Sequence, residues 1–169
     1  MSLGAHTFSF PIWVEFGNGK SDRVGELIDS KGWKTALIIT DQGIRKAGIL
    51  DIIETSIEGE NITYDIYDNV KPNPTESMVS DALSVLESGD HDVVVAVGGG
   101  SVIDTAKCAT LLKTNHLPLS EYEVNTPADV TAGTIESQTH PLITIPTTAG
   151  TGSEVDYWAV ITAEERQFK

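Results

Sequence analysis

A continuous apolar strand that runs directly into glycines constrains the fold most. Residues 92–97 read DVVVAV, and Gly98, Gly99 and Gly100 follow at once. An unbroken β-branched run of this length is typical of a strand buried on both faces, as in a parallel sheet covered by helices. Residues 101–112 continue as a helix, so the sequence predicts a strand–turn–helix unit of a βαβ fold.

The same alternation of buried strands and helices extends along most of the chain. The apolar residues of 115–140 no longer follow a helix or strand period, and the segment is rich in Pro, Thr, Ser and Glu. This composition predicts a long surface loop. A right-handed succession of such units predicts an α/β fold: a Rossmann-like, mainly parallel sheet with helices on both faces and a ligand crevice beyond the carboxyl ends of the strands. We expect helices over residues 20–30, 44–58, 75–88 and 101–112, and strands over residues 35–40, 62–67, 92–97 and 142–145.

Charge and cysteine content exclude several classes of partner. The chain has 169 residues, about one domain, and 11 Lys and Arg against 25 Asp and Glu give a net charge of −14. A charge of this sign repels nucleic acid and anionic membrane surfaces, so neither is expected as a partner. The single cysteine, Cys108, excludes an internal disulfide and is predicted to be a buried small hydrophobe. No apolar run approaches the roughly 20 residues that a membrane span needs, and we expect a cytoplasmic protein.

The stretch GGGSVIDTAK, residues 98–107, is a candidate ligand-binding motif at the end of the strand predicted over 92–97. Glycines let the backbone approach a ligand closely, and N–H groups at a helix start favour an anion such as a pyrophosphate. Ser101 is predicted as the helix N-cap, with Asp104 in a capping-box-like position. The alternative is that the glycines only make a tight turn. The pattern is neither GxGxxG nor a P-loop.

Two further strand ends carry polar groups. The stretch PTTAGTGSE, residues 146–154, follows the strand at 142–145 and offers several hydroxyl and N–H donors for phosphate or ribose recognition. Such a composition is also common in a purely polar loop. Asp41, after the strand at 35–40, could accept hydrogen bonds from both hydroxyls of a ribose and would repel a 2′-phosphate. On local sequence it is equally consistent with a helix N-cap or a turn residue.

These features, in this order, resemble the iron-containing (group III) alcohol dehydrogenase family. Residues 98–107 and 146–155 are similar to two N-terminal motifs of that family, and residues 16–19, FGNG, resemble its early FGxG turn. The resemblance covers residues 10–169. Glycerol dehydrogenases and dehydroquinate synthases share the fold and a similar glycine-rich turn but lack the second motif, so this motif separates the branches.

The resemblance implies a single nicotinamide dinucleotide-binding domain over residues 1–169, of the dehydroquinate synthase-like type. In the family, a following all-helical domain supplies one Asp and three His to a divalent metal, usually iron. An aspartate at position 41 also favours NAD over NADP. By resemblance, the cofactor-binding residues are Asp41 at the adenosine ribose, Gly98, Gly99, Gly100 and Ser101 at the pyrophosphate, Asp104 in the same motif, and Thr147, Thr148 and Thr151 at further phosphate and nicotinamide-side contacts.

Two residues near the end of the chain complete the expected site. Lys169 falls where the family has a cofactor-contacting lysine. Trp158 falls near the substrate side of the nicotinamide site, where a bulky ring would favour a small aldehyde, although it is equally consistent with a core aromatic. Residues 158–162 read as one arm of a hairpin that turns at 163–167, which suggests that the chain is a fragment.

No catalytic or metal-binding residue is expected in this chain. Its histidines show no pair at i, i+4 and no Asp at a matching distance, and we assign them all to solvent or loops. We therefore expect the metal site in a helical domain that follows this one. The histidines are His6, His91, His116 and His140.

The expected activity is the interconversion of a primary alcohol and its aldehyde by metal-assisted hydride transfer to or from NAD(H). This chain would be the cofactor-binding part, inactive by itself, of an enzyme with a small-molecule alcohol or aldehyde as substrate. We also expect a homo-oligomer. Two alternatives stay open: a non-catalytic nucleotide-binding module that pairs with another subunit, and a reductase of another small carbonyl compound on the same scaffold.

Overall fold

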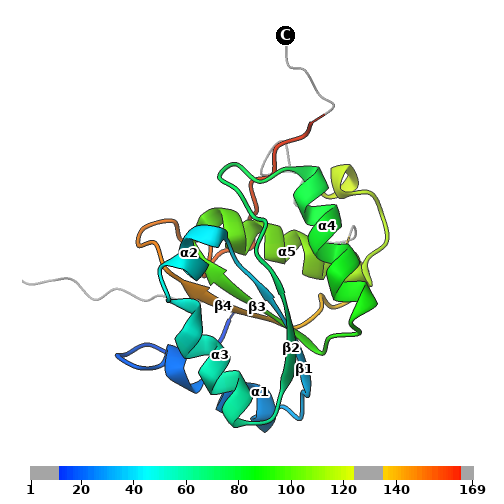
Figure 1. Cartoon of the computed structure of the whole chain (residues 1–169). Coiled ribbons are helices and arrows are strands. Elements are labelled where there is room, and N and C mark those ends of the chain that lie inside the picture. Colours follow the sequence, from blue (N-terminus) through cyan, green and yellow to red (C-terminus); the bar gives the residue numbers. More distant parts are fainter. Residues whose placement is uncertain (1–11, 124–134, 165–169) are drawn as a thin grey trace, which may run out of the picture.

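A four-stranded parallel sheet forms the centre of the computed structural model, which describes residues 12–123 and 135–164. The strand order is β2-β1-β3-β4, and every neighbouring pair is parallel (Figure 1). The predicted mainly parallel α/β fold is therefore confirmed. The strands are β1 (Thr35–Ile39), β2 (Thr63–Tyr67), β3 (Val93–Gly98) and β4 (Leu142–Pro146).

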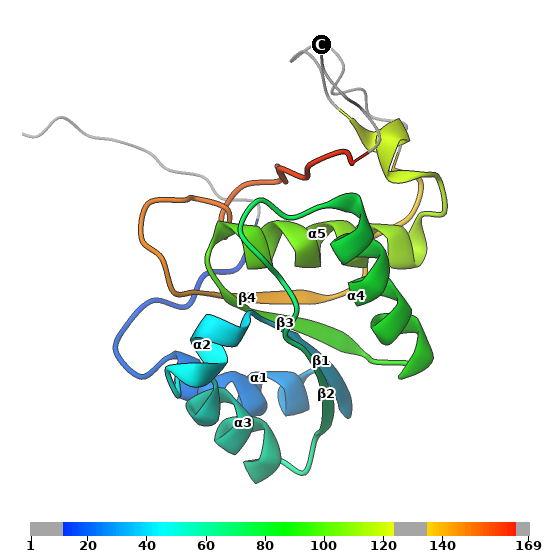
Figure 2. The ribbon, with the colours of Figure 1, turned by 45° about the horizontal axis from the view of Figure 1, so that its top comes forward.

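Helices cover both faces of the sheet. Figure 2 shows α1 and α3 on one face, and α4 and α5 on the other. The helix α4 begins at a threonine cap, because the Thr75 side chain accepts a hydrogen bond from the nitrogen of Met78. The helices are α1 (Val24–Ser30), α2 (Gln42–Lys46), α3 (Leu50–Gly59), α4 (Glu76–Ser88) and α5 (Gly100–Thr114), with short 3-10 turns at η1 (Ser21–Arg23) and η2 (Leu119–Tyr122).

The two inner strands divide the core into two apolar layers. Successive side chains of a strand point to opposite faces. Leu37 and Val94 therefore pack with α4 and α5, while Ile38 and Val95 pack with α1 and α3. All four are fully buried, and burial of one such side chain contributes about 1.5–3 kcal/mol. This two-sided burial is the physical reason that the inner strands are continuously apolar.

The helix predicted over 44–58 is wrong as a single helix, because the structure has two. The helix α2 ends in a Schellman motif: Ile49 N donates to Ile44 O at 3.4 Å, and Gly48 N donates to Arg45 O at 3.1 Å. Gly48 has a φ of 70°, which glycine adopts without steric cost. The next helix, α3, begins at Leu50.

The predicted hairpin arm at 158–162 is also not a strand. Only Thr162 makes a bridge, a parallel one to Thr75, at the start of α4. The N–H of Val160 donates instead to the side chain of Asp104 on α5. This segment is therefore held by two helices rather than by a neighbouring strand. The expected turn lies largely outside the described residues, which end at position 164.

Candidate functional site

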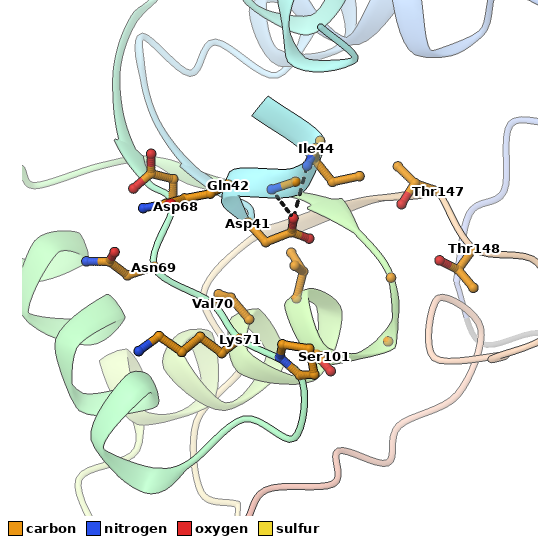
Figure 3. A pocket seen from close by; sticks show the side chains of 15 residues that line it. Asp41, Gln42, Ile44, Asp68, Asn69, Val70, Lys71, Ser101, Thr147 and Thr148 are labelled. Atoms are coloured by element: carbon orange, nitrogen blue, oxygen red, sulfur yellow. Dashed lines mark hydrogen bonds between the residues drawn. The ribbon is translucent and has the colours of Figure 1, made fainter. Parts of the chain in front are cut away.

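The carboxyl ends of all four strands meet at one cavity of about 520 Å³ (Figure 3). The strand order reverses between β1 and β3, and ligand crevices of open α/β sheets lie at such a switch point. The volume lies within the range of roughly 300–1,000 Å³ that small-molecule and cofactor sites occupy. The lining residues are Asp41, Gln42, Gly43 and Ile44 after β1, Asp68, Asn69, Val70, Lys71 and Pro72 after β2, Gly99, Gly100, Ser101 and Val102 after β3, and Thr147 and Thr148 after β4.

Two turns form one continuous wall of this cavity. The glycine turn after β3 comprises Gly99, Gly100 and Ser101, and the threonine turn after β4 comprises Thr147 and Thr148. Gly98 pairs with Pro146 at the end of the two strands, and the next residue, Thr147, donates its N–H to Gly98 O at 3.0 Å. Thr148 then lies against Gly99: a Cβ atom at Gly99 would stand 3.0 Å from Thr148 Oγ1. A residue with a side chain at position 99 would fill the space between the two turns.

The start of α5 supplies N–H groups to the cavity. The predicted Ser101 cap is wrong, because Gly99 is the N-cap and its carbonyl accepts from Val102 N and Ile103 N at 3.1 Å each. The N–H groups of Gly100 and Ser101 belong to the first turn, where a helix offers them no carbonyl partner. They lie at the positive end of the helix dipole, so this wall favours an anion.

Asp41 is a helix N-cap, one of the roles that its sequence context left open, and it also lines the cavity. It is the N-cap of α2, because its Oδ1 atom accepts from Gly43 N at 2.7 Å and from Ile44 N at 3.0 Å. It also lines the cavity, and Figure 3 shows it between the Asn69 side and the Thr147 side. Both bonds end on Oδ1.

The loop after β2 lines the cavity and was missed by sequence reasoning. Its Asp68 accepts a hydrogen bond from Arg45 Nη1 of α2 at 2.7 Å, which ties the loop to the helix that Asp41 caps. Asn69 also forms an antiparallel bridge with Asp41. The proline-rich KPNP stretch from Lys71 predicts a loop shortly after the strand at 62–67, and its place at the same sheet edge is the signal that could have assigned it to the site.

Asp104 lies outside the cavity lining. Its side chain is buried, with 7% of the residue exposed, and Oδ2 accepts from Val160 N at 3.1 Å. Burial raises the pKa of this carboxyl group, although hydrogen bonding to Val160 and the charge of Lys107 oppose the rise. The expected capping-box role is wrong, because Asp104 lies beyond the first turn of a helix that starts at Gly100.

The remaining predicted residues, Thr151, Trp158 and Lys169, are not among the described residues that line the cavity. Thr151 packs behind the glycine turn, where a Cβ atom at Gly100 would stand 3.5 Å from its Cγ2 atom. Trp158 is 41% exposed, lies outside the lining, and has its ring 5.0 Å from that of Tyr157. Lys169 lies outside the described residues. The structure therefore brings together Asp41, Gly99, Gly100, Ser101, Thr147 and Thr148, with Gly98 directly beneath them.

Within residues 12–123 and 135–164, no group of three or more His, Cys, Asp or Glu side chains could hold a metal ion. His91 lies in the loop before β3, as predicted, but it is buried, and its Nε2 atom is 3.0 Å from Asp65 Oδ2. His6 lies outside the described residues. In the same part of the chain, no helix combines the length and the apolar character needed to cross a membrane.

Comparisons with known proteins show the family to which this chain is similar. Residues 11–169 match the family model of the iron-containing alcohol dehydrogenases. A choline dehydrogenase of Bacillus subtilis is 41% identical over 164 residues, which is 97% of this chain and 40% of that protein. Alcohol dehydrogenase 4 of Schizosaccharomyces pombe is 38% identical over 170 residues, 99% of this chain and 38% of that protein.

Solved structures show the same fold. A 1,3-propanediol oxidoreductase superposes with a TM-score of 0.79 at 33% identity, over 95% of this chain and 41% of the other. The NADH-dependent butanol dehydrogenase A of Thermotoga maritima superposes with a TM-score of 0.78 at 31% identity, over 95% of this chain and 39% of the other. The chain thus spans about 40% of the length of relatives such as the B. subtilis protein. With its family match, its relatives and its parallel sheet taken together, the chain belongs to the iron-containing alcohol dehydrogenase family.

Proposed function

We propose that this chain is the NAD(H)-binding domain of an oxidoreductase that interconverts a primary alcohol and its aldehyde. The observation that carries the proposal is the single wall made by the glycine and threonine turns, with Asp41 in the same cavity. This wall fits the diphosphate of a dinucleotide, because it combines free N–H groups, a helix N-terminus and closely approachable backbone. The NADH dependence named for the butanol dehydrogenase supports the same ligand.

Each part of the cavity has its own proposed task. Gly99, Gly100 and Ser101 donate N–H groups to the diphosphate, and the hydroxyls of Thr147 and Thr148 bind it from the adjoining part of the same wall. Asp41 accepts the ribose hydroxyls and repels a 2′-phosphate, which makes NAD(H) the preferred dinucleotide. Thr151 and Lys169 stay predicted cofactor contacts, and Trp158 stays a predicted determinant of substrate size.

The chemistry itself needs groups beyond these residues. When bound, NAD(H) supplies or accepts the hydride, and a divalent metal, iron by family resemblance, supplies a Lewis acid. A metal site in a helical domain that follows this one stays a prediction of the family resemblance. A homo-oligomer and a cytoplasmic location stay predictions.

The proposal is tested by titrating NADH and NADPH into the intact protein and following the nucleotide fluorescence. We expect NADH to bind and NADPH to bind at least tenfold more weakly, as expected for about 1.4 kcal/mol of charge repulsion. Iron-dependent reduction of NAD in the presence of a primary alcohol then tests the activity. Binding without turnover on any primary alcohol would favour the non-catalytic module, and absence of NADH binding would contradict both.

A further inference from the structure

Two side chains of α5 that lie outside the cavity hold the chain segment that follows the threonine turn. This return segment comprises residues 150–160. Asp104 Oδ2 accepts from Val160 N at 3.1 Å, and Lys107 Nζ donates to Asp156 Oδ1 at 2.6 Å and to Trp158 O at 2.7 Å. The two side chains stand about one and two turns from the start of the helix that carries the glycine turn.

The return segment needs such anchors. Gly150 and Gly152 have positive φ angles of 93° and 73°, and glycine loses the most conformational freedom when it is ordered. The segment nevertheless packs closely against the glycine turn: a Cβ atom at Gly100 would stand 3.2 Å from Ser153 Oγ. A displacement of the segment would therefore move side chains that pack against the start of α5.

The two anchors differ in how far water reaches their hydrogen bonds. Asp104 is 7% exposed, so its bond to Val160 is poorly screened, whereas the Asp156 partner of Lys107 is 39% exposed. Within the described residues, Asp104 Oδ1 is buried without a hydrogen-bond partner, which makes this carboxylate costly to bury. A direct contact with a diphosphate would instead require the carboxylate to face the cavity, and Asp104 does not line it.

We propose that Asp104 and Lys107 are positioning residues that hold the return segment against α5, and thereby set the distance between the threonine turn and the glycine turn. This replaces the direct cofactor contact expected for Asp104. The inference rests on the proposed function, because the ligand whose binding it tunes is the dinucleotide diphosphate.

The test uses Asp104→Ala, Asp104→Asn, Lys107→Met and Lys107→Arg in the intact protein. Asp156→Asn removes the charge of one partner of Lys107 at a more exposed position, where failure to fold is less of a concern. Lys34→Met removes an exposed ion pair with Asp29 and serves as the matched control. Each variant is measured by hydrogen exchange of residues 150–160 without ligand, by NADH fluorescence, and by competition with ADP-ribose and with adenosine.

We expect Asp104→Ala and Lys107→Met to speed exchange in the return segment and to weaken NADH and ADP-ribose binding by about tenfold, as for loss of a charged hydrogen bond. Adenosine has no phosphate and should bind within about twofold of the unmutated protein. Asparagine still offers an oxygen to Val160 N, and arginine keeps the charge, so these two variants should recover most of the affinity. Asp156→Asn should show a smaller loss of the same kind.

Three results would overturn the inference. Faster exchange with unchanged NADH affinity would mean that the segment does not position the turns. Equal loss of adenosine and ADP-ribose binding would mean a general loss of folding, and weak NADH binding by Asp104→Asn with normal exchange would mean a direct role for the charge. If the unmutated protein failed to bind NADH, the proposed function would be contradicted, while the exchange data would still report whether the anchors hold the segment.

Discussion

The N–H of Thr147 donates to the carbonyl oxygen of Gly98 at 3.0 Å, one residue beyond the last paired position of β3 and β4. This bond continues the ladder between the two strands into the turns that follow them. The sheet therefore fixes where the glycine and threonine turns begin, side by side, and the return segment acts on the parts of the turns beyond this bond. A shift in the β3–β4 register would displace Thr148 from Gly99 and open the proposed diphosphate site.

Gly99→Ala should weaken NADH binding without unfolding the protein. The φ of −83° at Gly99 is open to any residue, so only the added methyl group matters, and it would stand 3.0 Å from Thr148 Oγ1 inside the cavity. We expect NADH affinity to fall about tenfold or more, equivalent to about 1.4 kcal/mol. Gly59→Ala is the control, since its Cβ meets nothing within 4 Å. Unchanged NADH titration by Gly99→Ala would contradict the proposed site.

Asp41→Asn and Asp41→Ala should separate the two roles of Asp41. Asparagine still caps a helix, so Asp41→Asn should keep its stability but lose the repulsion of a 2′-phosphate. We expect its preference for NADH over NADPH to fall about tenfold. Asp41→Ala should in addition lose about 1 kcal/mol of unfolding free energy, because the cap of α2 is removed. Calorimetric titration of both nucleotides and urea unfolding measure the two effects. An unchanged NADPH affinity in both variants would argue against the ribose role.

Gly25→Ala should destabilise the fold at a place far from the cavity. Gly25 N donates to Ser56 Oγ where α1 crosses α3, and a Cβ atom there would stand 2.0 Å from Ser56 O. Because the clash is with backbone, the helices must move apart, at a cost of about 1–3 kcal/mol or more. Urea unfolding measures the loss. A change below about 0.5 kcal/mol would show that the two helices separate easily.

The Cys108 thiol should be unreactive in the folded protein. Burial raises the pKa of this thiol to about 12, and the charge of Asp104 adds to the effect. The thiol is therefore neutral at physiological pH, and its thiolate appears only as the pH rises toward 12. At pH 8 it carries roughly a thousandfold less thiolate than a thiol that ionises near pH 9. Ellman's reagent should thus react slowly in buffer and rapidly in urea, and equal rates would contradict the burial.

The strands and the glycine turn could be predicted from the sequence because their signals are local. The run at 92–97 is apolar throughout because both of its faces are buried, and Asp41 follows its strand directly. The break at Gly48 was missed because the apolar spacing of the two helices continues across it, so only the backbone angle reveals it. The hydrogen bond of Asp104 was missed for a different reason: its partner, Val160, is far along the chain, and no local pattern connects them.

The cap that Asp41 forms on α2 bears on how this carboxylate would bind a ribose hydroxyl. Two backbone N–H groups already fix the rotamer of this carboxylate, so an arriving hydroxyl donor meets an acceptor that has no torsional freedom left to lose. The ribose selectivity proposed for Asp41 would therefore rest on a carboxylate that the fold has already oriented.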